Sequence, residues 1–169
     1  MSGLLFLTSD DFNVRKGMNG NILCTAIRGF SLILFYSNDC VHCTNLKPIY
    51  KRLPGSIGGC QFGMINVSMN FSCVQMSQHT IAPITFVPYI IMYVDGKPFM
   101  KYQGPHDEHE IKKFIIEVAN NIKVKQQFIN NNDKVKVTKG RIPEYCTGHP
   151  IKGDGKVCYL DFDEAYAEV

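Results

Sequence analysis

Two cysteines, Cys40 and Cys43, are separated by one valine and one histidine and follow directly on the apolar run of residues 32–36. An apolar run of this length, bounded by the polar segment 37–39, predicts a buried strand that ends in a turn, with a helix beginning at the first cysteine. The free N–H groups and partial positive charge of a helix N-terminus stabilise a thiolate. The pattern therefore predicts a reversible dithiol at a strand-to-helix junction, with Cys40 as the nucleophile and Cys43 as the resolving thiol.

Two other interpretations of this cysteine pair stay open. A close pair is half of many zinc sites, and unpaired cysteines are also common among buried core side chains. The next cysteines along the chain, Cys60 and Cys73, stand singly and do not form the second close pair that a zinc site usually has. We therefore expect redox chemistry rather than metal binding, with no metal and no cofactor.

Composition narrows the class of protein. The chain has 169 residues, of which 45% are hydrophobic, so one domain with an appended tail can form a real core. A formal net charge of +3 does not by itself argue for nucleic-acid or membrane binding, so neither partner is expected. No signal peptide or membrane-spanning run is visible. The seven cysteines are scattered, which suits a reducing compartment and predicts a cytoplasmic protein.

The remaining periodicities predict an α/β domain. Short apolar segments predict strands, and Asp95-Gly96 predicts a tight hairpin turn between two of them. Asp107 begins a helix whose apolar stripe runs to Ile122. Residues 12–28 are ambiguous, but an alternating order of strands and helices would place a helix there and gives a mixed central sheet flanked by helices. The expected strands are residues 4–7, 32–36, 62–67, 89–94 and 97–102, and the other expected helices are residues 40–53 and 73–79.

The chain changes character near Asn130. Lysines accumulate around three asparagines there, and an aromatic segment with two cysteines follows. We therefore divide the chain into a domain at 1–129 and a basic linker with a C-terminal tail at 130–169, and take the basic run as a solvated linker. Residues 157–162 could add a strand to a sheet edge. Cys146, His149 and Cys158 could bind a metal or form a disulfide, but their spacing matches no standard module, so core thiols are the default.

The sequence resembles the thioredoxin family from Leu4 to about Phe128. The resemblance is carried by the strand with its Cys-Val-His-Cys segment, by Pro48, by Val87-Pro88, by the turn at residues 95–97 and by Gly104. It implies a thioredoxin fold with a C-terminal extension. In that family the proline before the next strand is cis and lies against the active-site disulfide, and the residue before it pairs through its backbone with an extended substrate peptide. The resemblance assigns these roles to Pro88 and Val87.

The chain departs from the family pattern at three points. Asp39 stands where a tryptophan usually precedes the first cysteine, and its carboxylate opposes ionisation of Cys40. His42 can be cationic and favours the thiolate, as in more oxidising relatives, so these two residues tune the site in opposite directions. The buried aspartate and lysine of reducing thioredoxins fall at Leu34 and Met64. Because both charges are absent, neither is left buried without its partner. Their absence also removes a proton acceptor for Cys43.

A looser resemblance links the chain to thioredoxin-like proteins of large double-stranded DNA viruses, through segments 81–90 and 96–99 and the tail from Cys146 to Tyr166. It implies work in a host cytoplasm or a virion. The first hypothesis is a thiol–disulfide oxidoreductase that forms or reduces disulfides in protein substrates. The alternative is a structural or adaptor component, such as a minor capsid protein, that keeps the scaffold and binds virion subunits through its tail.

Overall fold

The computed structural model describes residues 3–132 and 160–161. The strands are β1 (Leu4–Leu7), β2 (Phe12–Lys16), β3 (Asn21–Thr25), β4 (Phe30–Tyr36), β5 (Cys60–Asn66), β6 (Tyr89–Val94), β7 (Lys97–Tyr102) and β8 (Leu160–Asp161). The helices are the short 3₁₀ helix η1 (Ser9–Asp11) and the α-helices α1 (Val41–Lys51), α2 (Phe71–Gln78) and α3 (Glu108–Asn132).

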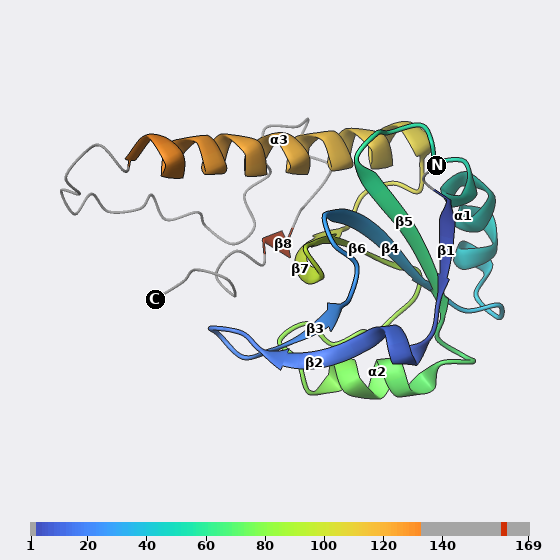
Figure 1. Cartoon of the computed structure of the whole chain (residues 1–169). Helices are drawn as coiled ribbons and strands as arrows, with labels where there is room; N and C mark the ends of the chain where they lie inside the picture. The colour runs from blue at the N-terminus through green and yellow to red at the C-terminus, as the bar shows by residue number, and fades with distance from the viewer. Residues whose placement is uncertain (1–2, 133–159, 162–169) are drawn as a thin grey trace.

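One mixed sheet organises the domain. Its strand order is β1-β5-β4-β6-β7-β8, with β1, β5 and β4 parallel and the remaining neighbours antiparallel. Helices α1 and α3 cover one face, while α2 and the separate β2–β3 hairpin cover the other (Figure 1). This arrangement confirms the predicted α/β class with a mixed central sheet.

Strand β4 is buried on both faces, as its continuous apolar sequence predicts. Leu32 and Leu34 pack into the core beneath α1 and α3, and Ile33 and Phe35 pack into the core on the α2 side. All four side chains are fully buried. The segment that follows β4 therefore starts from the most constrained strand of the sheet, which fixes the position of Cys40.

The Asp95-Gly96 turn is confirmed as a two-residue hairpin loop, because Val94 pairs with Lys97 across it. Asp95 and Gly96 both have positive φ, at 49° and 79°. A Cβ atom at Gly96 would collide with the carbonyl oxygen of Thr25, and Thr25 donates its N–H to the Gly96 carbonyl at 2.7 Å. The turn therefore needs glycine for two reasons, its backbone conformation and the close approach of β3.

The prediction of a helix between the first two expected strands, residues 4–7 and 32–36, is wrong. Residues 9–11 form one 3₁₀ turn, and residues 12–25 form the antiparallel β2–β3 hairpin. The loop closes where Gly17 donates its N–H to the Gly20 carbonyl at 2.7 Å, and Gly20 has a φ of 145°. Asn19-Gly20 favours a turn. The β-branched residues on both sides of this turn favour strands over a helix.

Tyr50 ties α1 to the sheet. Its hydroxyl lies 2.7 Å from the Leu32 carbonyl of β4 and 3.0 Å from the Gly63 carbonyl of β5, and its side chain is fully buried. Burial raises the pKa of this phenol well above its usual range. The hydroxyl has a single proton, which these two carbonyls share, and this contact fixes the helix carrying Cys43 against β4 and β5.

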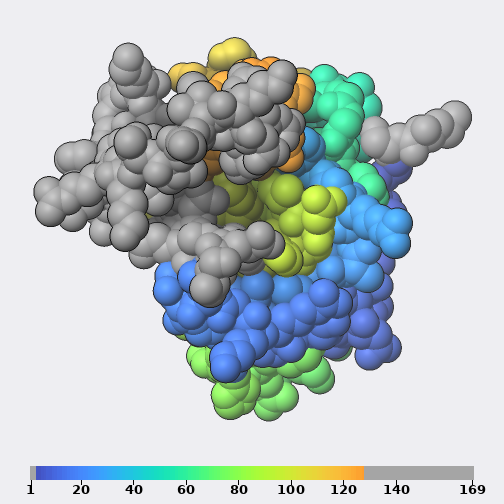
Figure 2. Space-filling view, turned by 60° about the vertical axis from the view of Figure 1, so that its left-hand side comes forward, coloured from blue at the N-terminus to red at the C-terminus, as the bar shows by residue number. Residues whose placement is uncertain are grey.

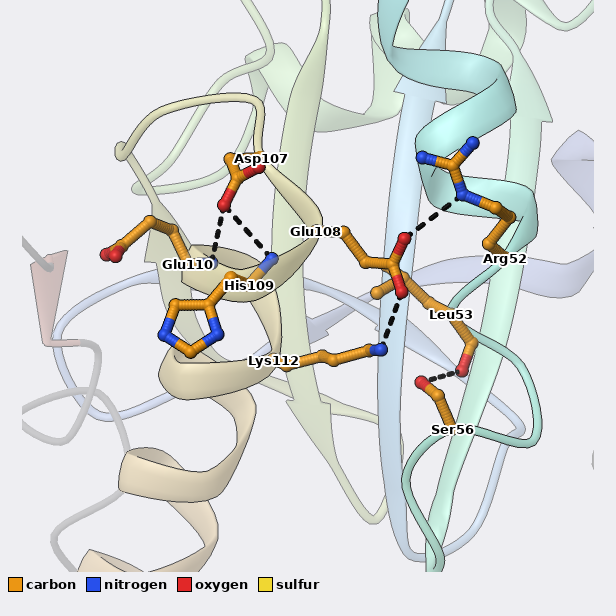
Figure 3. Close-up of polar contacts among 8 residues, drawn as sticks. All are labelled: Arg52, Leu53, Ser56, Asp107, Glu108, His109, Glu110 and Lys112. Carbon is orange, nitrogen blue, oxygen red and sulfur yellow. Dashed lines mark hydrogen bonds and ion pairs between the residues drawn. The ribbon is translucent and has the colours of Figure 1, made fainter.

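Polar contacts join the end of α1 to the start of α3 (Figure 3). Asp107 accepts hydrogen bonds from two backbone N–H groups of the first turn of α3, at 3.1 and 3.3 Å, which confirms the predicted helix start. Glu108 pairs with Arg52 at 3.0 Å and with Lys112 at 2.6 Å. Hydrogen bonds from Lys112 and then Arg52 lower the pKa of Glu108.

Helix α3 ends at Asn132, close to the boundary predicted near Asn130. None of the helices in the described part of the chain combines the length and apolar character needed to cross a membrane. Residues 157–162 were expected to add a strand to a sheet edge. Within that segment, Leu160 pairs with Lys101 of β7 and Asp161 pairs with Met100. Part of β7 is visible between α3 and the hairpin in Figure 2, although Lys97 is the one exposed residue of this strand. The other tail residues named above, Cys146, His149 and Cys158 included, lie outside the described residues, and the division into 1–129 and 130–169 stays a prediction.

Candidate active site

Cys40 lies at the junction between β4 and α1, where it is the N-cap of the helix with an extended backbone (φ −98°, ψ 117°). The backbone N–H of Cys43 donates to Cys40 Sγ at 3.2 Å, and the N–H of Thr44 donates to the Cys40 carbonyl at 3.0 Å. The sulfur thus occupies the place of a capping oxygen, facing the unpaired donors of the first helical turn.

The two cysteines have different environments. Cys40 is partly exposed, whereas Cys43 is fully buried. Burial, together with a hydrogen bond to Cys40, raises the pKa of the Cys43 thiol to about 11. Both are free thiols in this structure. An accessible first sulfur and a protected second sulfur suit attack by Cys40 and resolution by Cys43, although these roles stay predictions.

Val87 and Pro88 lie beside Cys40. Their peptide bond is cis, as the family resemblance implies. The Cys40 thiol donates to the Val87 carbonyl at a sulfur-to-oxygen distance of 3.5 Å, so the loop before β6 contacts the sulfur directly. Both loop residues are partly buried. The structure therefore brings together the cysteine and the backbone to which the resemblance assigns substrate binding.

The two predicted tuning residues are both exposed, so solvent screens their charges. The backbone N–H of Asp39 donates to Ser37 Oγ at 3.3 Å, which orders the turn before Cys40. His42 interacts with His106, a residue of the loop between β7 and α3 that the sequence did not single out. Burial lowers the pKa of His106, and the nearby charge of His42 lowers it further. A third segment thus lies near His42, and Gly104-Pro105 is its only signal in the sequence.

Leu34 and Met64, the positions of the missing buried charges, are neighbours. They are directly paired across β4 and β5, and their side chains are 0% and 1% exposed. Across residues 3–132, no aspartate or glutamate is buried. The cysteine pair therefore has no buried carboxylate below it among these residues to accept the Cys43 proton, in agreement with the sequence.

Lys47 is a second residue that the sequence did not single out. It follows Cys43 at the i+4 position of α1, the spacing that places two side chains on one helix face. Its ammonium lies 3.2 Å from Asn38 Oδ1 and 5.1 Å from the centre of the Tyr36 ring. Burial dominates the pKa of Cys43, and the positive charge of Lys47 partly opposes that effect.

The remaining described cysteines do not extend the site into a metal centre. Cys24, Cys60 and Cys73 are buried thiols, and burial raises the pKa of Cys60 and of Cys73 to about 12. Within residues 3–132 and 160–161, no three side chains of the histidine, cysteine or acidic types come close enough together to hold a metal ion. The interpretation of the pair as core thiols fits Cys43 alone, since Cys40 reaches solvent.

Comparison with known proteins defines the class. The model of the thioredoxin family matches residues 23–117. The chain therefore belongs to the thioredoxin family, and its fold is the thioredoxin fold expected from the resemblance.

Three relatives extend this result. The chain is 36% identical to uncharacterized protein 196R of Invertebrate iridescent virus 6, over 98% of this chain and 95% of that protein. It is 30% identical to uncharacterized protein 020R of Invertebrate iridescent virus 3, over 97% and 96%. It is 28% identical to Protein disulfide-isomerase like 2-2 of Arabidopsis thaliana, over 68% of this chain and 23% of that protein. The predicted similarity to proteins of large DNA viruses is thus confirmed.

Proposed function

We propose that this protein is a thiol–disulfide oxidoreductase that exchanges disulfides with protein substrates through Cys40 and Cys43. The observation that carries the proposal is the geometry of the pair: a partly exposed sulfur at a helix N-cap accepts a hydrogen bond from the backbone of a second, fully buried cysteine. Membership of the thioredoxin family and the similarity to a protein disulfide-isomerase support it.

The exchange has two balanced steps. The Cys40 thiolate attacks one sulfur of a substrate disulfide, which forms a mixed disulfide and releases the other substrate sulfur as a thiolate that takes a proton from water. Cys43 then gives up its proton and attacks Cys40 Sγ, so that the mixed disulfide breaks. The products are the Cys40–Cys43 disulfide and a second substrate thiol. Two electrons have passed to the substrate, and the reverse sequence oxidises a substrate dithiol.

His42 and Asp39 tune this exchange, and Val87 with Pro88 seats the peptide. An extended substrate strand needs backbone partners, and the Val87 backbone contacts the Cys40 sulfur from the loop before β6. No cofactor takes part in either step, because the electrons move between sulfur atoms.

A direct assay tests the proposal. The full chain, recycled by dithiothreitol, should reduce the disulfides of insulin at a rate proportional to the amount of chain. The matched control is the double variant Cys40→Ser, Cys43→Ser, which should give the rate of dithiothreitol alone. A wild-type rate equal to that control would refute the proposal.

A second candidate function is that of a structural or adaptor component of a virus particle, acting in host cytoplasm and virion. Its support is that both viral relatives match this chain over at least 97% of its length, well beyond the residues of the thioredoxin domain. Dithiol chemistry alone does not require the added segment. Leu160 and Asp161 pair with β7, so the added segment reaches the sheet edge.

Deleting residues 141–169 separates the two functions. If the tail serves assembly through its aromatic residues, the truncated chain should lose capture of virion proteins while keeping insulin reduction within about twofold, because the deletion leaves the cysteine pair in place. Co-precipitation from infected cells and the insulin assay measure the two properties. Normal capture by the truncated chain, or loss of redox activity before capture, would rule out the adaptor function.

A further inference from the structure

Lys101 is a buried lysine without a carboxylate partner among residues 3–127, the part of the chain whose side chains the structure describes. Its side chain lies in β7 and is 6% exposed. Its ammonium is 4.2 Å from the centre of the Phe86 ring and 4.2 Å from the centre of the Tyr89 ring. The ion pairs of Glu108 with Arg52 and Lys112 do not involve Lys101. Buried lysines are rare unless paired, so the faces of these two rings take the place of an anion.

The ring of Phe86 is held on its inner side and open on its outer side. Besides the ammonium, the Tyr89 ring contacts it at 5.6 Å between centres and 59° between planes. Tyr89 in turn packs edge-on against Phe35 of β4, at 6.2 Å. Yet the Phe86 side chain is 54% exposed. An aromatic ring kept at the surface by contacts from beneath forms a rigid apolar platform.

The Phe86 platform lies next in sequence to the residue that contacts the Cys40 sulfur. Phe86 directly precedes Val87, whose carbonyl oxygen lies 3.5 Å from Cys40 Sγ. Residues of an extended peptide advance about 3.3 Å each along the strand, and the side chains on one face recur at every second residue. A peptide that pairs with Val87 while its cysteine reaches Cys40 therefore passes a neighbouring side chain over the Phe86 ring.

We propose that Phe86 selects substrates with an aromatic or large aliphatic side chain within two residues of the reacting cysteine, and that Lys101 is a positioning residue that holds the Phe86 ring in place. This inference rests on the proposed oxidoreductase function and names its substrate class. Recognition of an acidic substrate by Lys101 itself is excluded by its burial beneath the rings. The ammonium acts on the substrate only through Phe86.

The test uses a series of symmetric peptide disulfides that react once with the reduced full chain. One peptide has only serines around its cysteine, and the others carry a single phenylalanine at each position from two residues before to two after it. The rate constant for oxidation of the chain should be about tenfold higher for the best phenylalanine position than for the serine peptide, the size expected for an aromatic pair in contact. A small symmetric disulfide without a peptide, hydroxyethyl disulfide, reports the sulfur chemistry alone.

Four variants test which residues cause the preference for the phenylalanine peptides. Phe86→Ala should reduce it to below twofold, and Lys101→Met should reduce it to about threefold, because the ring loses the cation that holds it. Lys101→Arg keeps a cation over the rings and should restore the preference. Phe6→Ala is the matched control, since Phe6 is 69% exposed on β1 at the opposite edge of the sheet, and it should leave the preference unchanged. All four should react with hydroxyethyl disulfide at the wild-type rate within about twofold, since none touches the cysteines.

The possible outcomes are distinguishable. Equal rates for all peptides with the wild-type chain, or a preference that survives in Phe86→Ala, would overturn the selection by Phe86. A preference that survives in Lys101→Met, or that Lys101→Arg fails to restore, would overturn the positioning role. Failure of the wild-type chain to react with hydroxyethyl disulfide as well as with the peptides would instead overturn the proposed function.

Discussion

Replacing Cys40 with serine is expected to lower the rate of disulfide exchange by at least about a thousandfold, since a hydroxyl at this position neither ionises near neutral pH nor forms a disulfide. The fold should survive, because Cys40 is partly exposed and serine is itself a favourable N-cap residue. Single-turnover oxidation of the reduced chain by a peptide disulfide measures the effect. Cys73→Ala is the control, because Cys73 is a buried thiol outside the pair and should retain the wild-type rate.

Cys43→Ser should behave differently from Cys40→Ser. Attack by Cys40 still occurs, but no second thiol resolves the product, so a mixed disulfide with the substrate accumulates and is visible by mass spectrometry. The asymmetry follows from the exposure of the two sulfurs, since only Cys40 reaches solvent. Full activity in both single variants, or trapping by Cys40→Ser instead, would contradict the assigned order of attack.

The resolving step should accelerate steeply with pH. Burial is the main cause that raises the pKa of Cys43, and it persists in the mixed disulfide, so the nucleophilic thiolate is scarce at neutral pH. The thiolate fraction, and with it the rate of resolution, should rise about tenfold per pH unit from pH 7 up to the raised pKa. Rapid mixing that follows release of the second substrate thiol measures this rate. A rate of resolution that levels off below pH 8 would show that another group takes the Cys43 proton.

The fold was predictable where local signals agreed with tertiary packing. The apolar run of β4, the Asp95-Gly96 turn and the helix beginning after Asp107 each combine a periodicity with a cap or turn residue, and each lies close to where the sequence places it. The prediction for residues 12–25 failed because their apolar positions fit neither the period of a helix nor that of a strand. There the pairing of Phe12 with Thr25 and the contacts of the hairpin with α2 decide the structure, and neither is visible in local sequence.

Some residues of the candidate site could be predicted from the sequence and others could not. The cysteine pair and Val87-Pro88 carry motifs, so the sequence could place them. His106 and Lys101 lie more than fifty residues from Cys40 along the chain and carry no motif. They become relevant only because the sheet brings the end of β7 beside the loop before β6, where Ile90 pairs with Tyr102. Such contacts follow from strand register, which side-chain periodicity does not specify between distant segments.

Equilibration of the full chain against a series of glutathione redox buffers tests the central claim most directly, because it asks whether Cys40 and Cys43 form a reversible disulfide. Alkylation of the remaining thiols followed by mass spectrometry identifies the pair and its midpoint. The account predicts one two-electron transition between Cys40 and Cys43. Its midpoint should be less reducing than the value of about −270 mV typical of thioredoxin, because His42 is present and no aspartate or glutamate of residues 3–127 is buried beside the pair. A midpoint at or below that value would contradict the expected redox poise. If Cys40 and Cys43 stay unpaired in the most oxidising buffer, the proposed oxidoreductase function is wrong.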